Sequence, residues 1–154
     1  MIETYIEYLS WAIGMFLFFC FVPKSKIQQA IIGILVMQLL TWPLGLIVVE
    51  LNLITYPVRF FDDATKASFT FEYFIFPIVS GLFNIHYPKN QSVWKVFIYT
   101  SVIVSLLTIG EVLLEIFTNN IEYVNWHWYW SWLSMFAVLH LSYRIYRFVI
   151  LLRA

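Results

Sequence analysis

Five long apolar segments dominate this chain, and each can cross a lipid bilayer as a helix, some only with their interfacial ends counted. Such a helix needs about 20 residues to span a hydrocarbon core about 30 Å thick. A helix pairs its own backbone polar groups, which find no water in that core. We therefore predict an all-α integral membrane bundle of about five transmembrane helices, forming a single domain over residues 1–154. The predicted helices are about 5–22, 27–49, 69–87, 93–117 and 128–152.

The composition excludes an ordinary soluble domain. Hydrophobic residues make up 62% of the chain and charged residues 12%, whereas soluble domains have about 45–50% and about 25%. The aromatic content of 21% suits a protein with two membrane interfaces, where Trp and Tyr rings settle. The net charge is zero, so no nucleic-acid partner is expected. Cys20 is the only cysteine, which excludes an intramolecular disulfide.

Basic residues decide the predicted orientation. If the turn at 23–26 is cytoplasmic, seven Lys and Arg residues lie inside and two lie outside, so the positive-inside rule favours N-out/C-in. The carboxylates are distributed in the opposite way: eight are expected at or near the outer face, and Glu111 lies about one helical turn deeper. The inner cations are Lys24, Lys26, Lys89, Lys95, Arg144, Arg147 and Arg153, and the outer ones are Arg59 and Lys66.

The fourth predicted helix carries its polar residues on one side. At about 100° per residue they fall within an arc of about 120°. A charge at the centre of a bilayer costs about 2.5–3.5 kcal/mol on insertion scales, so this side is expected to face other helices or a watery cavity. The polar residues are Ser101, Ser105, Thr108, Glu111, Glu115 and Asn119.

Glu111 and Glu115 are therefore the central candidate site residues, as a proton donor, a cation site or a hydrogen-bond clamp. They are neighbours on the helix surface, and two like charges in a low-dielectric site rarely both ionise. Arg59 in the outer connection and Glu72 in the third predicted helix are within their expected reach. The four residues form either a buried network that fixes helix register or a functional pocket open to the outer leaflet. Both interpretations stay open, because a network can line a pocket.

A second, weaker candidate lies toward the cytoplasmic end of the last predicted helix. Arg144 and Arg147 share a helix face with His140 and could form an anionic site, for example for a lipid phosphate. The favoured interpretation is that both arginines extend to the inner headgroups and the histidine is bonded inside the bundle. No metal site is predicted, because His86 and His127 are expected at opposite membrane faces. We expect no cofactor.

Three further stretches are interpreted as structural. The aromatic run at 126–132 is predicted to anchor the chain at the interface rather than to stack on a ligand. The connection 52–68 is predicted to lie in the interface, with room for one helical turn. Its Asp62 and Asp63 are similar to the acidic pairs that hold magnesium on diphosphate substrates, but a solvated turn is the favoured interpretation of a lone pair.

Four motifs occur together: Tyr56-Pro-Val-Arg59, Phe69-Thr-Phe-Glu-Tyr-Phe-Ile-Phe-Pro77, Glu111-x-x-x-Glu115 and Tyr123-Val-Asn-Trp-His-Trp-Tyr-Trp130. In this combination the chain after about residue 40 resembles an uncharacterised family of small multi-pass membrane proteins from spore-forming Gram-positive bacteria. The resemblance implies a bacterial plasma membrane or spore membrane location. It assigns no catalytic residue, and it directs attention to the four candidate residues named above.

Three functions remain open. The favoured one is an accessory or ligand-binding (including lipid-binding) protein with an outer-leaflet polar pocket, since no complete catalytic constellation occurs. The second is a membrane-embedded enzyme that uses a glutamate pair for acid–base chemistry on an apolar, isoprenoid-like substrate. The third is a small transporter or channel, which requires an oligomer because five helices leave little room for alternating access. The expected partners are membrane lipids, with a second membrane protein or another copy of the chain as alternatives.

Overall fold

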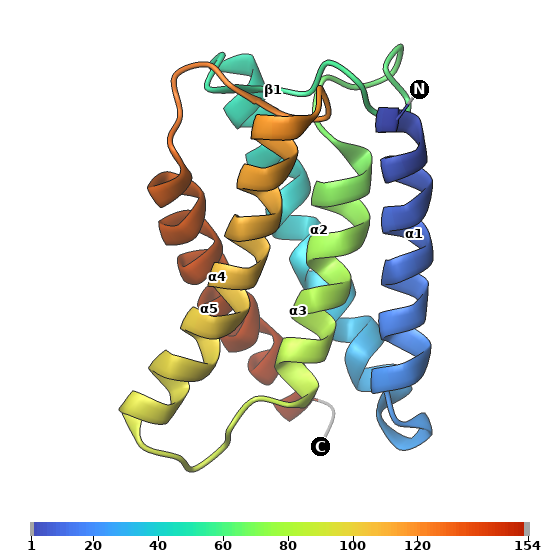
Figure 1. Cartoon of the computed structure of the whole chain (residues 1–154). Helices are drawn as coiled ribbons and strands as arrows, with labels where there is room; N and C mark the ends of the chain where they lie inside the picture. The colour runs from blue at the N-terminus through green and yellow to red at the C-terminus, as the bar shows by residue number, and fades with distance from the viewer. Residues whose placement is uncertain (1, 153–154) are drawn as a thin grey trace.

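A computed structural model describes residues 2–152 as a bundle of long helices closed at one end by a small two-stranded sheet (Figure 1). Arg153, counted above among the inner cations, lies outside the described residues. The elements are α1 (Ile2–Phe21), the short 3-10 helix η1 (Lys24–Lys26), α2 (Ile27–Glu50), β1 (Ile54–Thr55), the π-helix η2 (Phe69–Ile75), α3 (Phe76–Ile85), α4 (Val93–Phe117), β2 (Glu122–Tyr123) and α5 (Trp128–Leu151).

The prediction of an all-α membrane bundle of about five helices is confirmed. Within the described residues, α1, α2 with η1, α4 and α5 are long and apolar enough to cross a membrane. The fifth apolar helix, η2 with α3, runs continuously over Phe69–Ile85 and is shorter. The predicted bounds hold to within three residues at each end, and those of the fourth helix are unchanged.

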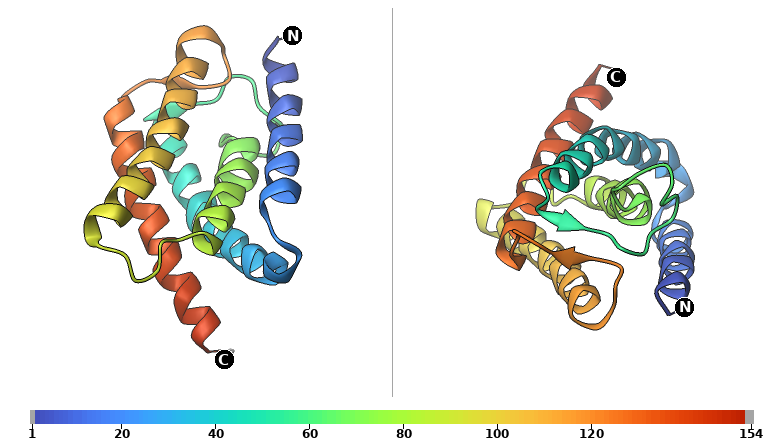
Figure 2. Two further views of the ribbon diagram at one scale, coloured as in Figure 1. Left: turned by 60° about the horizontal axis from the view of Figure 1, so that its bottom comes forward. Right: turned by 90° about the horizontal axis from the view of Figure 1, so that it is seen from above.

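The short helix formed by η2 and α3 lies in the middle of the bundle. Viewed from above, α3 is surrounded by the other helices (Figure 2), and most of its residues are buried. A helix that is apolar on all sides is expected in such a position, because no side of it meets water. α3 packs mainly against α2. A Cβ atom at Gly81 would lie 3.0 Å from the carbonyl oxygen of Ala30, so this glycine lets the two helices approach closely.

Pro77 sits where the π-helix becomes an α-helix. A proline has no backbone N–H, so two carbonyls before it lose a helical donor: that of Glu72 in the π pattern and that of Tyr73 in the α pattern. Side chains of α2 replace both donors. The Thr41 hydroxyl donates to the Glu72 oxygen at 2.6 Å, and the Gln38 amide donates to the Tyr73 oxygen at 2.9 Å. The π-to-α junction at this proline is therefore held by side chains of α2.

The two ends of the bundle differ in charge and in structure. One end holds the turn between α1 and α2, the connection between α3 and α4, and the C-terminus; the other holds the N-terminus and the two longer connections (Figure 1). The lysines of the α1–α2 turn and of the α3–α4 connection lie at the first end. The two longer connections, which hold Arg59, Lys66 and exposed acidic residues, lie at the second. The predicted partition of charge is thus present in the folded chain.

The two longer connections pair with each other. Ile54 pairs with Tyr123 and Thr55 with Glu122 in an antiparallel sheet, and the Val58 N–H donates to the Asn119 carbonyl at 3.0 Å. The stretch 52–68 contains turns and no helix, so the helical turn allowed for in the sequence is absent from these described residues. The pairing places a lid, formed by residues 52–68 and 118–127, over the end of the helices that begins α1.

Candidate functional site

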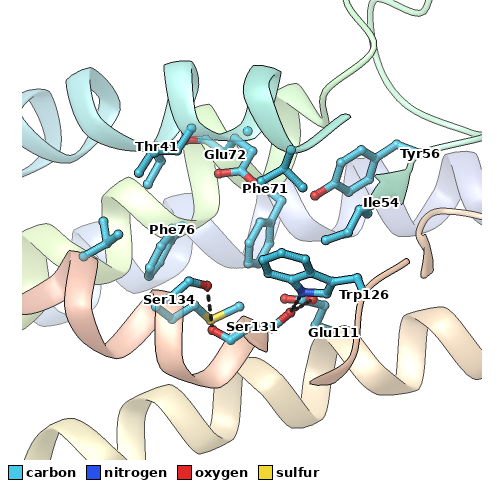
Figure 3. A pocket seen from close by; sticks show the side chains of 15 residues that line it. Thr41, Ile54, Tyr56, Phe71, Glu72, Phe76, Glu111, Trp126, Ser131 and Ser134 are labelled. Carbon is cyan, nitrogen blue, oxygen red and sulfur yellow. Dashed lines mark hydrogen bonds between the residues drawn. The ribbon is translucent and has the colours of Figure 1, made fainter. Parts of the chain in front are cut away.

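A cavity of about 250 Å³ lies beneath this lid, enclosed by α2, η2, α4 and α5. Its walls are mostly apolar and aromatic, and two carboxyl groups enter it from opposite sides, Glu72 from η2 and Glu111 from α4 (Figure 3). Binding pockets commonly combine apolar walls with a few placed polar groups, and volumes of about 300 Å³ mark the small end of their range. The cavity is slightly smaller than that range, and its chemistry suits a headgroup or another small group.

Glu72 owes its position to the π-helix and to a glycine on the facing helix. Its backbone carbonyl is held by the Thr41 hydroxyl, and its side chain lies against α2. A Cβ atom at Gly45 would lie 2.9 Å from Glu72 Cγ and 3.0 Å from Cδ. Only glycine leaves this space, so α2 is shaped to receive the carboxyl-bearing side chain.

Glu111 is buried and held by donors on the opposite wall. Its Oε1 accepts hydrogen bonds from the Ser131 hydroxyl at 2.6 Å and the Tyr123 hydroxyl at 2.5 Å. The Trp126 indole N–H in turn donates to Ser131 Oγ at 2.8 Å. Three residues from the lid and α5 thus orient one oxygen of the carboxyl, and the group remains an acceptor toward the cavity.

Two tyrosines of the lid stand next to the carboxyls. Tyr56 is buried, and its hydroxyl interacts with the Glu72 carboxyl; burial and the two nearby carboxyls raise the pKa of Tyr56 well above its usual range. Burial and the Glu111 carboxyl likewise raise the pKa of Tyr123. Both hydroxyls therefore keep their protons and act as donors to the glutamates. The sheet register is what brings these rings over the cavity.

From the exposure of its lining we infer that the cavity opens sideways, between α2 and α5. Among the residues that line it, Leu44 of α2 and Ser134 of α5 are exposed, and the others are buried or half-buried. Trp126 covers the outer side, and the Phe71 ring stands beside it in the interior (Figure 3). A molecule dissolved in the bilayer could enter by this route without crossing the lid.

Comparison with known proteins finds no matching family model, no similar curated protein and no similar solved structure. The function must therefore be argued from the site itself.

The structure brings together two of the four predicted site residues and separates the other two. The Arg59 guanidinium donates to the carbonyl oxygens of Tyr56, Asp62 and Thr65, at 2.7, 3.0 and 2.6 Å. It thus organises the 52–68 connection and does not line the cavity. Glu115 lies farther out, in a surface depression with Asn119 and Glu122. These two residues therefore do not line the cavity, because backbone carbonyls compete for the arginine and Glu115 lines a separate depression.

The weaker candidate site, His140 with Arg144 and Arg147, lies along α5. The His140 ring packs against those of Phe83 and Phe136, with centroids 6.3 and 4.7 Å apart. Arg144 and Arg147 are exposed on α5. Asp62 and Asp63 lie in an exposed turn, and no group of residues suited to a metal ion occurs within 2–152.

A second carboxyl that the sequence does not mark as buried belongs to Glu7. Glu7 of α1 is buried; it accepts hydrogen bonds from the Thr70 hydroxyl and from the Asn120 amide, the latter at 3.4 Å. The Asn120 amide also lies 3.3 Å from the Val58 carbonyl oxygen, and the Trp11 indole donates to Thr70 at 3.0 Å. The partners come from four separate segments, so no local spacing reveals them. This cluster joins α1 to the lid and η2.

Proposed function

We propose that this protein is a ligand-binding membrane protein whose site is the cavity between Glu72 and Glu111. One observation carries the proposal: two carboxyls, each held in place by its own set of neighbours, face one cavity that opens toward the lipid. A network that served only to fix helix register would bring the two carboxyls together with their donors and leave no space between them. Here a cavity of about 250 Å³ lies between the walls that carry the two carboxyls.

The sideways opening favours a ligand that reaches the site from the bilayer, such as a lipid or another amphiphile. We also propose a bacterial plasma membrane location, on the strength of the family resemblance. The partition of charge is the one expected of a chain inserted N-out/C-in.

Native mass spectrometry of the protein released in mild detergent from its own membrane tests the proposal. We expect a discrete bound mass on the wild-type protein. Glu72→Gln and Glu111→Gln should each lose most of it, whereas Glu115→Gln, a matched change outside the cavity, should retain it. The same spectra report whether another copy or another protein is bound. A wild-type protein with an empty cavity, or equal retention in all three variants, would contradict the proposal.

One observation favours a second candidate, an enzyme for acid–base chemistry on an apolar substrate. Each glutamate has a protonated tyrosine beside it, Tyr56 or Tyr123, and general acid–base catalysis needs such positioned proton donors and acceptors. Expression in a host that makes polyprenoids, followed by a comparison of lipid extracts with those from a Glu111→Gln strain, tests this candidate. A new product that depends on Glu111 would favour the enzyme, and identical extracts would remove it.

A further inference from the structure

We propose that the ligand of this cavity is an organic cation, an amine or quaternary ammonium group carried on an apolar body. The inference rests on the proposed function and specifies which chemistry the site selects.

The charges of the cavity are the first reason. Glu72 and Glu111 line it, and none of the other lining residues is basic. The nearby cations of the lid are engaged elsewhere: Arg59 binds backbone carbonyls, and Lys66 lies 3.0 Å from Glu50. A carboxyl in a low-dielectric site must either keep its proton or find a counter-charge, because an unpaired charge there is costly to desolvate. A bound cation supplies that counter-charge, whereas a bound anion would add a further unpaired negative charge.

The aromatic walls are the second reason. Rings of Tyr56, Phe71 and Trp126 line the cavity between the two carboxyls (Figure 3). The faces of such rings attract cations, and cages of this kind recognise ammonium groups. Carboxyls and ring faces in the same cavity therefore favour the same sign of charge by two independent interactions.

The oxygen atoms available argue for an organic cation over a metal ion. A calcium ion takes 6–8 oxygen ligands, and magnesium requires a near-ideal octahedron. Besides the carboxyls and Tyr56, the oxygen-bearing side chains of this lining are three hydroxyls with hydrogen bonds of their own. Thr41 donates to Met37 and Glu72 carbonyls, Ser131 to Glu111, and Ser134 to the Ser131 carbonyl.

The opening indicates where the rest of the ligand lies. Leu44, Val48 and Val138 line the side of the cavity between α2 and α5. An ammonium group held between the glutamates would place its alkyl chain along these residues and out toward the bilayer. This arrangement matches a single-chain amphiphile and leaves no polar group of the ligand in lipid.

Binding of four soluble probes with the same alkyl chain tests the inference on wild-type protein in zwitterionic nanodiscs. The probes are hexylammonium, hexyltrimethylammonium, 1-hexanol and hexanoate, measured by calorimetry against empty nanodiscs. We expect at least one of the two cations to bind at least tenfold more tightly than 1-hexanol, and hexanoate to bind least. Glu111→Gln should lower the affinity for the cation at least tenfold and leave that for 1-hexanol unchanged, whereas Glu115→Gln should change neither.

The outcomes separate this inference from the proposed function. If 1-hexanol or hexanoate bound as tightly as the cations, or if sodium or calcium ions alone bound at the cavity and displaced them, the organic cation would be wrong while a binding site remained. A neutral or anionic molecule retained in native mass spectra would have the same consequence. If no probe bound and the native protein were also empty, the proposed function itself would fail. The comparison of probes on wild-type protein requires no variant to fold.

Discussion

At the scale of single residues, the site depends on how each carboxyl is held. Glu111 accepts two hydrogen bonds from Ser131 and Tyr123, and Glu72 fits into space left by Gly45. These contacts fix the positions of the two carboxyls. Recognition of a ligand requires such fixed positions, and burial of an acid alone does not.

Replacing Glu111 by alanine should destabilise the protein. The change leaves the buried hydroxyls of Ser131 and Tyr123 without their acceptor, which costs about 1–3 kcal/mol. We expect SDS titration in mixed micelles to show a loss of that size in the free energy of unfolding. Glu115→Ala removes a half-buried carboxyl that lies outside the cavity, and it should cost less than Glu111→Ala. Equal effects of the two changes would contradict the arrangement described for Glu111.

The sequence indicates the carboxyls but not their partners. Glu72 and Glu111 were predictable as site residues, because a charge in an apolar helix must face inward. The place of Arg59 is not predictable, since its side chain bonds carbonyls of its own connection, and main-chain acceptors leave no mark in a sequence. The burial of Glu7 is not predictable either, because its partners Thr70 and Asn120 lie 63 and 113 positions away.

At the scale of elements, the π-helix η2 is the part that carries the site. Single π-type turns inside helices occur frequently at functional positions. Here Pro77 removes the donor that a regular helix needs, and Gln38 and Thr41 replace it. Hydropathy predicted where this helix lies, and the sequence shows Pro77 inside it. They could not predict a π-helix, because a proline in a helix is equally compatible with a simple kink.

Pro77→Ala should return this segment toward a regular α-helix. The restored N–H would compete with Gln38 and Thr41 for the freed carbonyls. A change from a π turn to an α turn takes one residue out of that turn's hydrogen-bonded ring and rotates the preceding side chains by about 100°. We expect Glu72 to leave the cavity and the bound mass to fall at least tenfold in native mass spectra. Unfolding free energy should be unchanged or higher, since a proline inside a helix costs about 3 kcal/mol.

Pro43→Ala is the matched control for that experiment. Pro43 lies inside α2 and is exposed, so its replacement should leave the retained ligand unchanged. Wild-type retention in Pro77→Ala, together with an unchanged fold, would show that the π-helix does not position Glu72.

The junction between α1 and the lid depends on Asn120. Its amide lies within 3.4 Å of oxygens of Glu3, Glu7 and Val58. Asn120→Ala should therefore lower the free energy of unfolding by about 1–3 kcal/mol and speed proteolysis of the lid. Asn119→Ala removes an exposed amide and should cost less than about 1 kcal/mol. A smaller effect at position 120 than at 119 would mean that this cluster does not hold α1 in place.

At the scale of the whole molecule, the two ends of the bundle differ in charge, and the cavity lies in one half. The bundle has lysines in the connections at one end, acidic connections at the other, and a cavity in the half that carries the lid. The number and bounds of the helices were predictable from hydropathy. The lid was not, because its strands are two residues each and pair across 67 positions of sequence.

Labelling with a membrane-impermeant maleimide tests the predicted orientation. In a Cys20→Ser background, Asp63→Cys places a thiol in the lid and Gln91→Cys places one in the α3–α4 connection, and both positions are exposed. We expect intact cells to label the lid position only, and permeabilised cells to label both. The reverse pattern would place the lid in the cytoplasm and make the N-out/C-in topology wrong.

An experimental structure of protein purified from its own membrane, solved in a lipid environment, would test the central claim most directly. We expect density between the Glu72 and Glu111 carboxyls, with a compact end against the rings of Tyr56 and Trp126 and a tail that leaves between α2 and α5. A closed cavity in which the two carboxyls are bonded to each other, with no density between them, would contradict a binding site and leave a structural network in its place.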